Sequence, residues 1–196
     1  MNIRLISLVA MLAQPAGAVA ANEIYLLDPA HTIAGFSVQV LGLSTIRGRF
    51  DRASGKIVLD RAAAAGSVEV TIPTATASTG DSRRNDVARW RDERLRSEDL
   101  FDVAEFPEMV FRSTRFHFVG DTVRSIDGTL TLRGVTRPVT LAATSFFCGI
   151  DPTSRKDICG GDLVASIKRS DFGMPYAVPV ISDEVRLFIA VEAYRQ

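Results

Sequence analysis

Few side chains in this sequence could do chemistry, and its only two cysteines, Cys148 and Cys159, are the first of them. They flank the polar, turn-rich segment 149–158, which predicts a hairpin loop between two β-like stretches. A catalytic thiol needs a nearby base and a zinc site needs about four ligands. Neither histidine is near the cysteines in the sequence. Because paired cysteines are typical of oxidising compartments, we predict a disulfide and no metal site.

The remaining candidates for catalysis are two histidines and a group of acids. His31 precedes an alternating stretch and fits a hydrogen-bonding residue at the start of a strand, whereas His117 lies between two phenylalanines and should face solvent. The acids of segment 99–105 are typical of a solvated face around a short helix. There is no GxSxG nucleophile elbow and no GxxxxGK[ST] phosphate loop. We therefore expect no enzyme and no catalytic cofactor.

The first 20 residues have the pattern of a secretory signal peptide. One positive charge precedes the apolar run 5–13, and Ala18 and Ala20 supply the small residues of an A-x-A cleavage site. The run is shorter than the roughly 20 residues that cross a bilayer; an uncleaved membrane anchor is the alternative. We expect residues 1–20 to be removed, residues 21–196 to form one domain without stable membrane insertion, and the protein to reside in the periplasm.

The charge of the chain is balanced, because 23 Lys and Arg residues stand against 23 Asp and Glu residues. Nucleic-acid binding depends on excess positive charge, so we expect no nucleic-acid partner. The same balance argues against strongly electrostatic attachment to a membrane surface.

Apolar and polar residues alternate with a period of two through most of the sequence. Each run predicts a strand with one apolar face. Turn-forming residues at 51–55, 120–121 and 134 separate the runs. We expect about eight strands joined by hairpins in an all-β domain, which could close as a sandwich or a barrel. The clearest runs are 36–40, 68–72, 116–118, 129–133 and 185–192.

Segment 81–103 interrupts this alternation because it is highly charged. Val87, Trp90 and Leu95 are near helical spacing, which predicts a surface helix with a narrow apolar stripe and a short turn at 97–101. Packing is the simpler role for Trp90. A flexible flap over the mouth of a barrel is the alternative.

Several ordered motifs are spread along the chain: DPAHT at 28–32 with FSV at 36–38, GLSTIRGRF at 42–50, LRSEDLFD at 95–102 with FP at 106–107, GTLTLRGVTRPV at 128–139, RSDFGM at 169–174 and SDEV at 182–185. Together they resemble the YceI-like family, which is described as secreted, lipocalin-like barrels that bind polyisoprenoids, including isoprenoid quinones. The resemblance implies an eight-stranded antiparallel lipocalin-like barrel with one or two short helices and an apolar tunnel. It implies a periplasmic carrier for a polyisoprenoid lipid such as an isoprenoid quinone.

Two positions depart from the family pattern. Val40 stands where relatives often carry histidine after the first apolar strand, and Arg94 stands where the middle motif often reads HLRS. The tunnel should therefore be more apolar near Val40 and more basic near Arg94.

Candidate contacts to a lipid fall into two sets, because tail contacts supply affinity and a few polar groups at the mouth select the head group. A filled core is the alternative for the apolar set, and a turn held by an aspartate is the alternative for segment 169–171. The apolar candidates are Phe36, Val38, Val40, Phe111, Leu130, Leu132, Ile167 and Phe172; the polar candidates are Arg94, Arg96, Arg169, Ser170 and Asp171.

Two other functions stay open at this point. One is a small enzyme that acts on an apolar substrate at the barrel mouth, with His31 or Asp171 as base. The other is a binding module for a membrane redox partner. A second copy of the chain is a further partner that the sequence leaves open.

Overall fold

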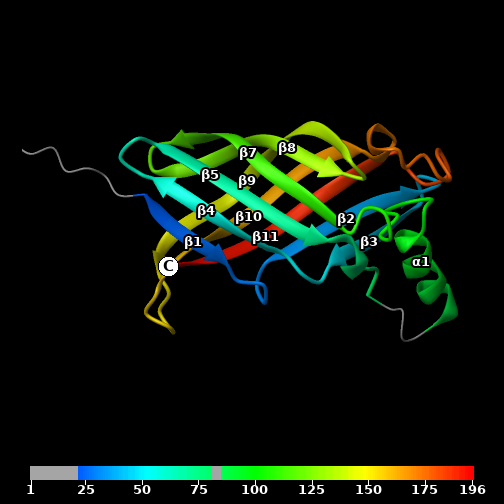
Figure 1. Ribbon diagram of the computed structural model, residues 1–196, viewed down its shortest axis with the longest axis horizontal. Coiled ribbons are helices and arrows are strands. Elements are labelled where there is room, and N and C mark those ends of the chain that lie inside the picture. The colour runs from blue at the N-terminus through cyan, green and yellow to red at the C-terminus, as the bar shows by residue number, and fades with distance from the viewer. Residues whose placement is uncertain (1–21, 81–84) are drawn as a thin grey trace, which may run out of the picture.

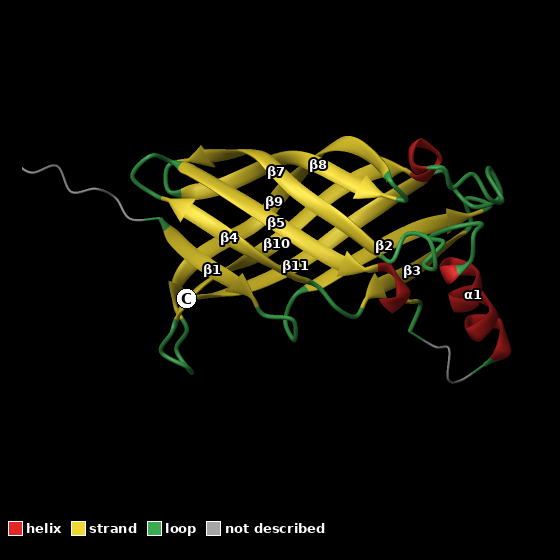
Figure 2. Cartoon of the chain, viewed as in Figure 1, coloured by secondary structure: helices red, strands yellow, loops and turns green. Residues whose placement is uncertain are grey.

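The computed structural model describes residues 22–80 and 85–196 (Figure 1). The predicted signal peptide and residues 81–84 of the predicted helical segment lie outside the described residues. The described chain forms a closed, eight-stranded antiparallel barrel, and its one α-helix lies at an end of the barrel (Figure 2). The prediction of an all-β barrel is confirmed.

Eleven labelled strands build this barrel, because several barrel strands are bent into two segments. The strands are β1 (Glu23–Leu27), β2 (Ile33–Val40), β3 (Ser44–Phe50), β4 (Ser54–Asp60), β5 (Ala65–Pro73), β6 (Ala77–Ser78), β7 (Glu108–Val119), β8 (Thr122–Leu132), β9 (Val135–Ile150), β10 (Asp157–Lys168) and β11 (Glu184–Arg195). The helices are the 3-10 helices η1 (Thr74–Thr76) and η2 (Arg169–Phe172) and the α-helix α1 (Asp86–Arg96).

Strand pairing closes the sheet on itself. The order runs β1-β4-β5-β7-β8-β9-β10-β11, and β11 pairs back with β1. The preceding part of β11, residues 186–190, pairs with β2, which pairs with β3, and β3 pairs with β6. The chain therefore bends at residues 28–32, so that β1 and β2 occupy successive parts of one barrel position.

The two ends of the barrel carry different connections (Figure 1). The end that we call the hairpin end has the tight connections 61–64, 120–121 and 151–156. The opposite end, which we call the helix end, has the β2–β3 turn at 41–43, the long connection with α1 and the β10–β11 connection.

The hairpin end is tightly packed. Tyr25, Val123 and Cys159 are almost completely buried there, in a core cluster shared by most of the strands. Cys159 faces Cys148 across β9 and β10, and the two form the predicted disulfide. The Tyr25 hydroxyl donates a 2.8 Å hydrogen bond to Glu23, so the polar atom of this side chain also has a partner. We call the packed core around Tyr25 the plug.

Helix α1 is attached differently from the prediction. The expected apolar stripe is wrong for Val87, which is 68% exposed, and for Trp90, which is also exposed, whereas Leu95 packs against the core cluster at the helix end. Ala88 and Asp92 are buried instead. The Asp92 carboxylate accepts hydrogen bonds from the Thr79 backbone N–H at 2.8 Å and from its hydroxyl at 2.7 Å. A buried polar anchor therefore replaces the apolar stripe that helical spacing indicated.

Candidate functional site

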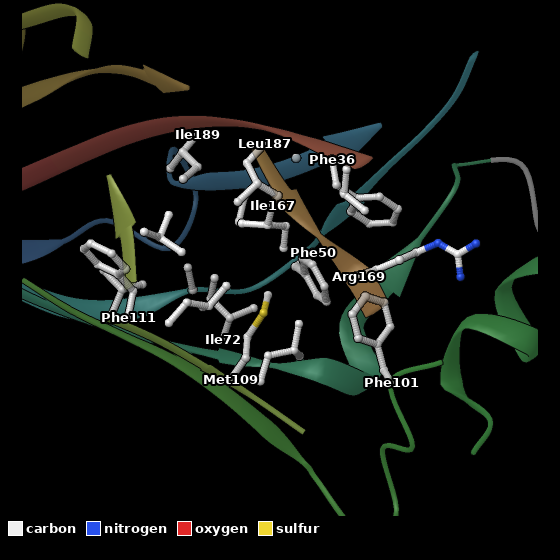
Figure 3. Close-up of a pocket in the computed structure, with 18 of the residues that line it drawn as sticks. Phe36, Phe50, Ile72, Phe101, Met109, Phe111, Ile167, Arg169, Leu187 and Ile189 are labelled. Atoms are coloured by element: carbon white, nitrogen blue, oxygen red, sulfur yellow. The ribbon is translucent and has the colours of Figure 1, made fainter. Parts of the chain in front are cut away.

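An elongated cavity of about 240 Å³ runs through the barrel interior (Figure 3). A void that holds one water molecule needs only about 10–15 Å³, so this is no packing defect. Its wall runs from Leu141 and Val191 in the half nearer the hairpin end to Leu132 and Val185 nearer the helix end. The wall is almost entirely aliphatic and aromatic. We call this cavity the tunnel.

Two glycines packed beneath wall phenylalanines help to keep the tunnel open. A Cβ atom on Gly48 would lie 2.3 Å from the Phe36 ring, and one on Gly128 would lie 2.4 Å from the Phe111 ring. Each ring therefore occupies the space over a glycine, against the wall. Side chains at 48 and 128 would force the rings toward the lumen, which a barrel of this size can otherwise fill with its own side chains.

Most of the predicted apolar residues lie on the tunnel wall, but two do not. Val40 lies off the wall near the end of β2, although its bridge partner Ile181 lies on the wall. Phe172 belongs to η2 and is packed behind the wall, in the core cluster at the helix end. The predicted residues on the wall are Phe36, Val38, Phe111, Leu130, Leu132 and Ile167.

Three aromatic rings lie together on the tunnel wall toward the helix end (Figure 3). Phe50 and Phe101 have ring centroids 5.3 Å apart, and Phe36 lies 5.7 Å from Phe50. Sequence reasoning missed Phe50 and Phe101. Phe50 ends an alternating motif and could have been found by its period. Phe101 follows a charged turn, and no periodicity marks it.

Arg169 is buried at this end and organises the β10–β11 connection. Its guanidinium donates hydrogen bonds of 2.7–2.9 Å to four main-chain carbonyls between Met174 and Ser182. Burial lowers the pKa of this guanidinium, and the Asp183 carboxylate opposes the effect. Arg169 also contributes to the tunnel wall. It positions a segment that otherwise has little strand pairing to satisfy its carbonyls.

The other polar candidates of segment 169–171 are not on the tunnel wall. The Ser170 hydroxyl donates a 2.7 Å hydrogen bond to Asp183, and this bond is the main cause of a lowered pKa for Asp183. The aspartate that holds the turn is therefore Asp183, whereas Asp171 is exposed. Two family motifs, at 169–174 and 182–185, thus meet in space.

The arginines of α1 have separate roles. Arg96 lies off the wall and donates to the carbonyls of Ala75 and Ala77 at 3.0 and 2.8 Å, which ties the helix to η1 and β6. Arg94 lies on the wall at the mouth, as predicted, and forms an ion pair with Asp99.

Aromatic rings flank Arg94, and a second arginine lies near it. Its guanidinium is 5.4 Å from the centroid of the Trp90 ring and 5.1 Å from that of Tyr176. Arg91 also lies on the wall and has no hydrogen bond or ion pair within the part of the chain that the structure describes. Sequence reasoning did not place Arg91 or Tyr176 here. Helix α1 lies beside the mouth, which is the place that the alternative interpretation of segment 81–103 as a flap gave it.

His31 does not line the tunnel and lies at the bend between β1 and β2. Its Nδ1 atom is 2.6 Å from the Asp28 carboxylate and 3.8 Å from Glu192. The hydrogen bond to Asp28 raises the pKa of His31. These three side chains are close enough to share a metal ion, but the short His31–Asp28 contact already matches the predicted strand-start role. Since neither His31 nor Asp171 lines the tunnel, the geometry does not support the enzyme hypothesis.

His117 lies on the outer face, where its Nε2 atom is 2.6 Å from the Asp127 carboxylate. Within the described residues, no helix is both long enough and apolar enough to cross a membrane.

Comparison with known proteins agrees with this geometry. The model of the YceI-like domain matches residues 25–193. Protein YceI of Salmonella arizonae is 35% identical over 196 residues, which are 100% of this chain and 98% of that protein.

Two solved structures share the fold. BcnA of Burkholderia cenocepacia superposes with a TM-score of 0.69 at 22% identity, over 85% of this chain and 98% of that one. A polyisoprenoid binding domain from Saccharophagus degradans superposes with a TM-score of 0.58 at 17% identity, over 88% and 98% of the two chains. From its sequence and its barrel, the chain belongs to the YceI-like family.

Proposed function

We propose that this protein is a periplasmic carrier or store for a polyisoprenoid lipid such as an isoprenoid quinone. The observation that carries the proposal is the tunnel, an apolar cavity left open along the barrel. The shared fold with a polyisoprenoid binding domain supports the class of ligand. The signal-peptide pattern and the Cys148–Cys159 disulfide support the compartment.

The energetics fit a prenyl tail. Burying each CH₂ contributes about 0.8 kcal/mol, so one isoprene unit contributes roughly 3–4 kcal/mol. A handful of units would approach the practical affinity ceiling of about 18–21 kcal/mol, so ordering of the tail must offset part of this gain. The tail therefore supplies affinity with little selectivity.

The mouth offers groups that can select a head. Arg91 and Arg94 present N–H donors at the mouth, and the rings of Trp90 and Tyr176 flank Arg94. A planar head group with carbonyl acceptors, such as a quinone, matches donors beside aromatic rings.

Retention of a lipid tests the proposal. The protein is expressed with its own leader, purified from the periplasmic fraction without detergent and extracted with organic solvent for mass spectrometry. We expect a prenyl-chain compound in near-stoichiometric amount. Purified protein that neither retains nor takes up a prenyl lipid contradicts the proposal.

A matched pair of glycine variants tests whether the tunnel holds the lipid. In Gly48→Ala, the new Cβ displaces the Phe36 ring toward the lumen, so lipid content should fall. In the control Gly149→Ala, at a position off the tunnel wall, the new Cβ meets the exposed Phe147 ring instead, at 2.5 Å. That control should retain lipid as the unchanged protein does. Equal losses in both variants would mean that strand damage, and not tunnel shape, causes the effect.

A further inference from the structure

Four aliphatic side chains project into solvent at the helix end of the barrel. In the β2–β3 turn, Leu41 is 64% exposed and Leu43 is 86% exposed. Val178 and Val180, in the β10–β11 connection, are exposed as well. We call these four residues the apolar rim. Single exposed apolar residues need no explanation, but a group of them marks an interaction surface.

Main-chain hydrogen bonds join the two parts of the apolar rim. The Leu41 N–H donates to the Val180 carbonyl at 2.8 Å, and the Ser182 N–H donates to the Gln39 carbonyl at 2.8 Å. From the interior side, the Arg169 guanidinium donates hydrogen bonds to the Tyr176 and Ile181 carbonyls of the same β10–β11 connection. The rim is therefore a preformed surface on an anchored backbone.

The turn itself carries an unfavourable residue. Leu41 and Gly42 have φ values of 53° and 68°, and the Leu43 N–H donates to the Val40 carbonyl at 2.9 Å. This geometry is that of a two-residue turn that favours Asn-Gly, and leucine is disfavoured at positive φ. Leu41 therefore suits neither the local backbone nor contact with water, which points to a partner that covers it.

We propose that the apolar rim docks reversibly into the surface of a lipid bilayer and sets the tunnel mouth against the lipid. The inference rests on the proposed function, because a carrier of a membrane lipid must load and unload at a bilayer. The rim continues the tunnel wall outward. Ile181 lies on the wall and the exposed Val180 directly precedes it in the chain, whereas Val38 lies on the wall and the exposed Leu41 follows it three residues later. A prenyl tail could pass from bilayer to tunnel without crossing water.

The neighbouring residues of α1 fit the same partner. Trp90 is exposed beside the mouth, and Arg91 and Arg94 are near it. Tryptophan is enriched at membrane–water interfaces, and arginine is attracted to anionic lipid head groups. A lipid surface therefore complements both the aliphatic rim and the basic helix, whereas the balanced charge of the whole chain makes the attachment weak and reversible.

Flotation with protein-free vesicles of phosphatidylethanolamine and phosphatidylglycerol tests the rim. The double variant Leu41→Asn/Leu43→Ser removes two rim side chains, and asparagine suits the turn, so thermal stability should be kept or raised. We expect the vesicle-bound fraction to fall about tenfold, because the two leucine side chains would contribute to the affinity for the vesicle when they are buried in the bilayer. The matched control is Phe147→Ser/Ile150→Ser, which removes two exposed apolar side chains at the hairpin end. It should float as the unchanged protein does.

Uptake of a prenyl lipid from detergent micelles separates this inference from the proposed function. The rim variant should take up as much lipid from micelles as the unchanged protein but transfer it more slowly between vesicles. If the unchanged protein takes up lipid from micelles but does not bind vesicles, the docking surface is overturned and the proposed carrier function stands. Vesicle binding without any uptake would overturn the carrier and leave the surface. Membrane attachment that requires an added membrane protein would replace the lipid surface by a protein partner.

Discussion

The hairpin end and the helix end of the barrel differ in which side chains are buried. At the hairpin end, apolar side chains fill the interior around Tyr25, and the Glu23–Arg61 ion pair lies at the surface. At the helix end, Asp92 and Arg169 are buried, while aliphatic side chains of the apolar rim face solvent. The contrast lies within one continuous sheet.

The difference follows from how each end satisfies its backbone. Tight hairpins at the hairpin end leave few main-chain groups without strand partners, so apolar packing can close the barrel. The long connections at the helix end lack that pairing, and buried side chains must bind their carbonyl and N–H groups. Arg169 and Asp92 do this. The hairpin end thus closes the tunnel, whereas the helix end supports an opening.

Truncating the plug should have the largest effect on stability. Tyr25→Ala removes a large, almost fully buried side chain, and we expect a loss of about 3–5 kcal/mol in the free energy of unfolding. Denaturant titration followed by circular dichroism measures it. If the hairpin end serves stability alone, the folded variant should still retain lipid. A loss below about 1 kcal/mol would mean that this end is not the tightly packed plug that its burial indicates.

Removing the disulfide should have the next largest effect. Cys148→Ala/Cys159→Ala opens a loop with a sequence separation of 11 residues, which should cost about 3 kcal/mol in the chain-entropy model. The same titration measures it, with and without a reductant. Since the variant has no disulfide, reductant should destabilise only the unchanged protein. Equal sensitivity of both proteins would contradict the assignment.

Releasing α1 should produce a smaller loss of stability but a larger change in lipid exchange. Asp92→Ala removes the acceptor for the Thr79 N–H and hydroxyl, at a cost of about 1–3 kcal/mol. We expect faster amide exchange in α1 and faster release of bound lipid. Glu93→Ala changes the neighbouring exposed acid and serves as the control. Unchanged lipid release in Asp92→Ala would show that the helix does not limit access to the tunnel.

The bend at residues 28–32 should contribute the smallest effect, and it should depend on pH. The hydrogen bond to Asp28 raises the pKa of His31 above its ordinary value of 6.5, so the folded protein holds this proton more tightly. While Asp28 is ionised, this stabilisation is fully present below pH 6.5 and is lost as pH rises through the raised pKa of His31.

A thermal comparison with His31→Gln tests this dependence. The unchanged protein should melt at a higher temperature than the variant at about pH 5.5, and the gap should narrow by about pH 8.5. A gap that widens with pH would reverse the sign of the linkage. Lipid content should not differ, because neither His31 nor Asp28 lines the tunnel.

Much of the molecule was predictable from the sequence. Alternation located the strands, the spacing of Cys148 and Cys159 indicated their pairing, and family motifs indicated the barrel. Six of the eight apolar candidates lie on the wall, because the period of two specifies which residues share a face. The helical spacing of apolar residues did not predict how α1 is attached, because Asp92 anchors that helix through a polar contact.

What the sequence by itself determined is therefore local: which segments are strands, which side of each is apolar, and which two cysteines can meet. The tertiary structure alone decided that the interior is open and that one end is a mouth. The lumen depends on strand register, which sets Gly48 opposite Phe36. The mouth depends on contacts between distant segments, such as Ser170 with Asp183 and Leu41 with Val180. Neither follows from periodicity, because periodicity is a property of one strand. Register and the hydrogen bonds between loops depend on two segments that are distant in the sequence.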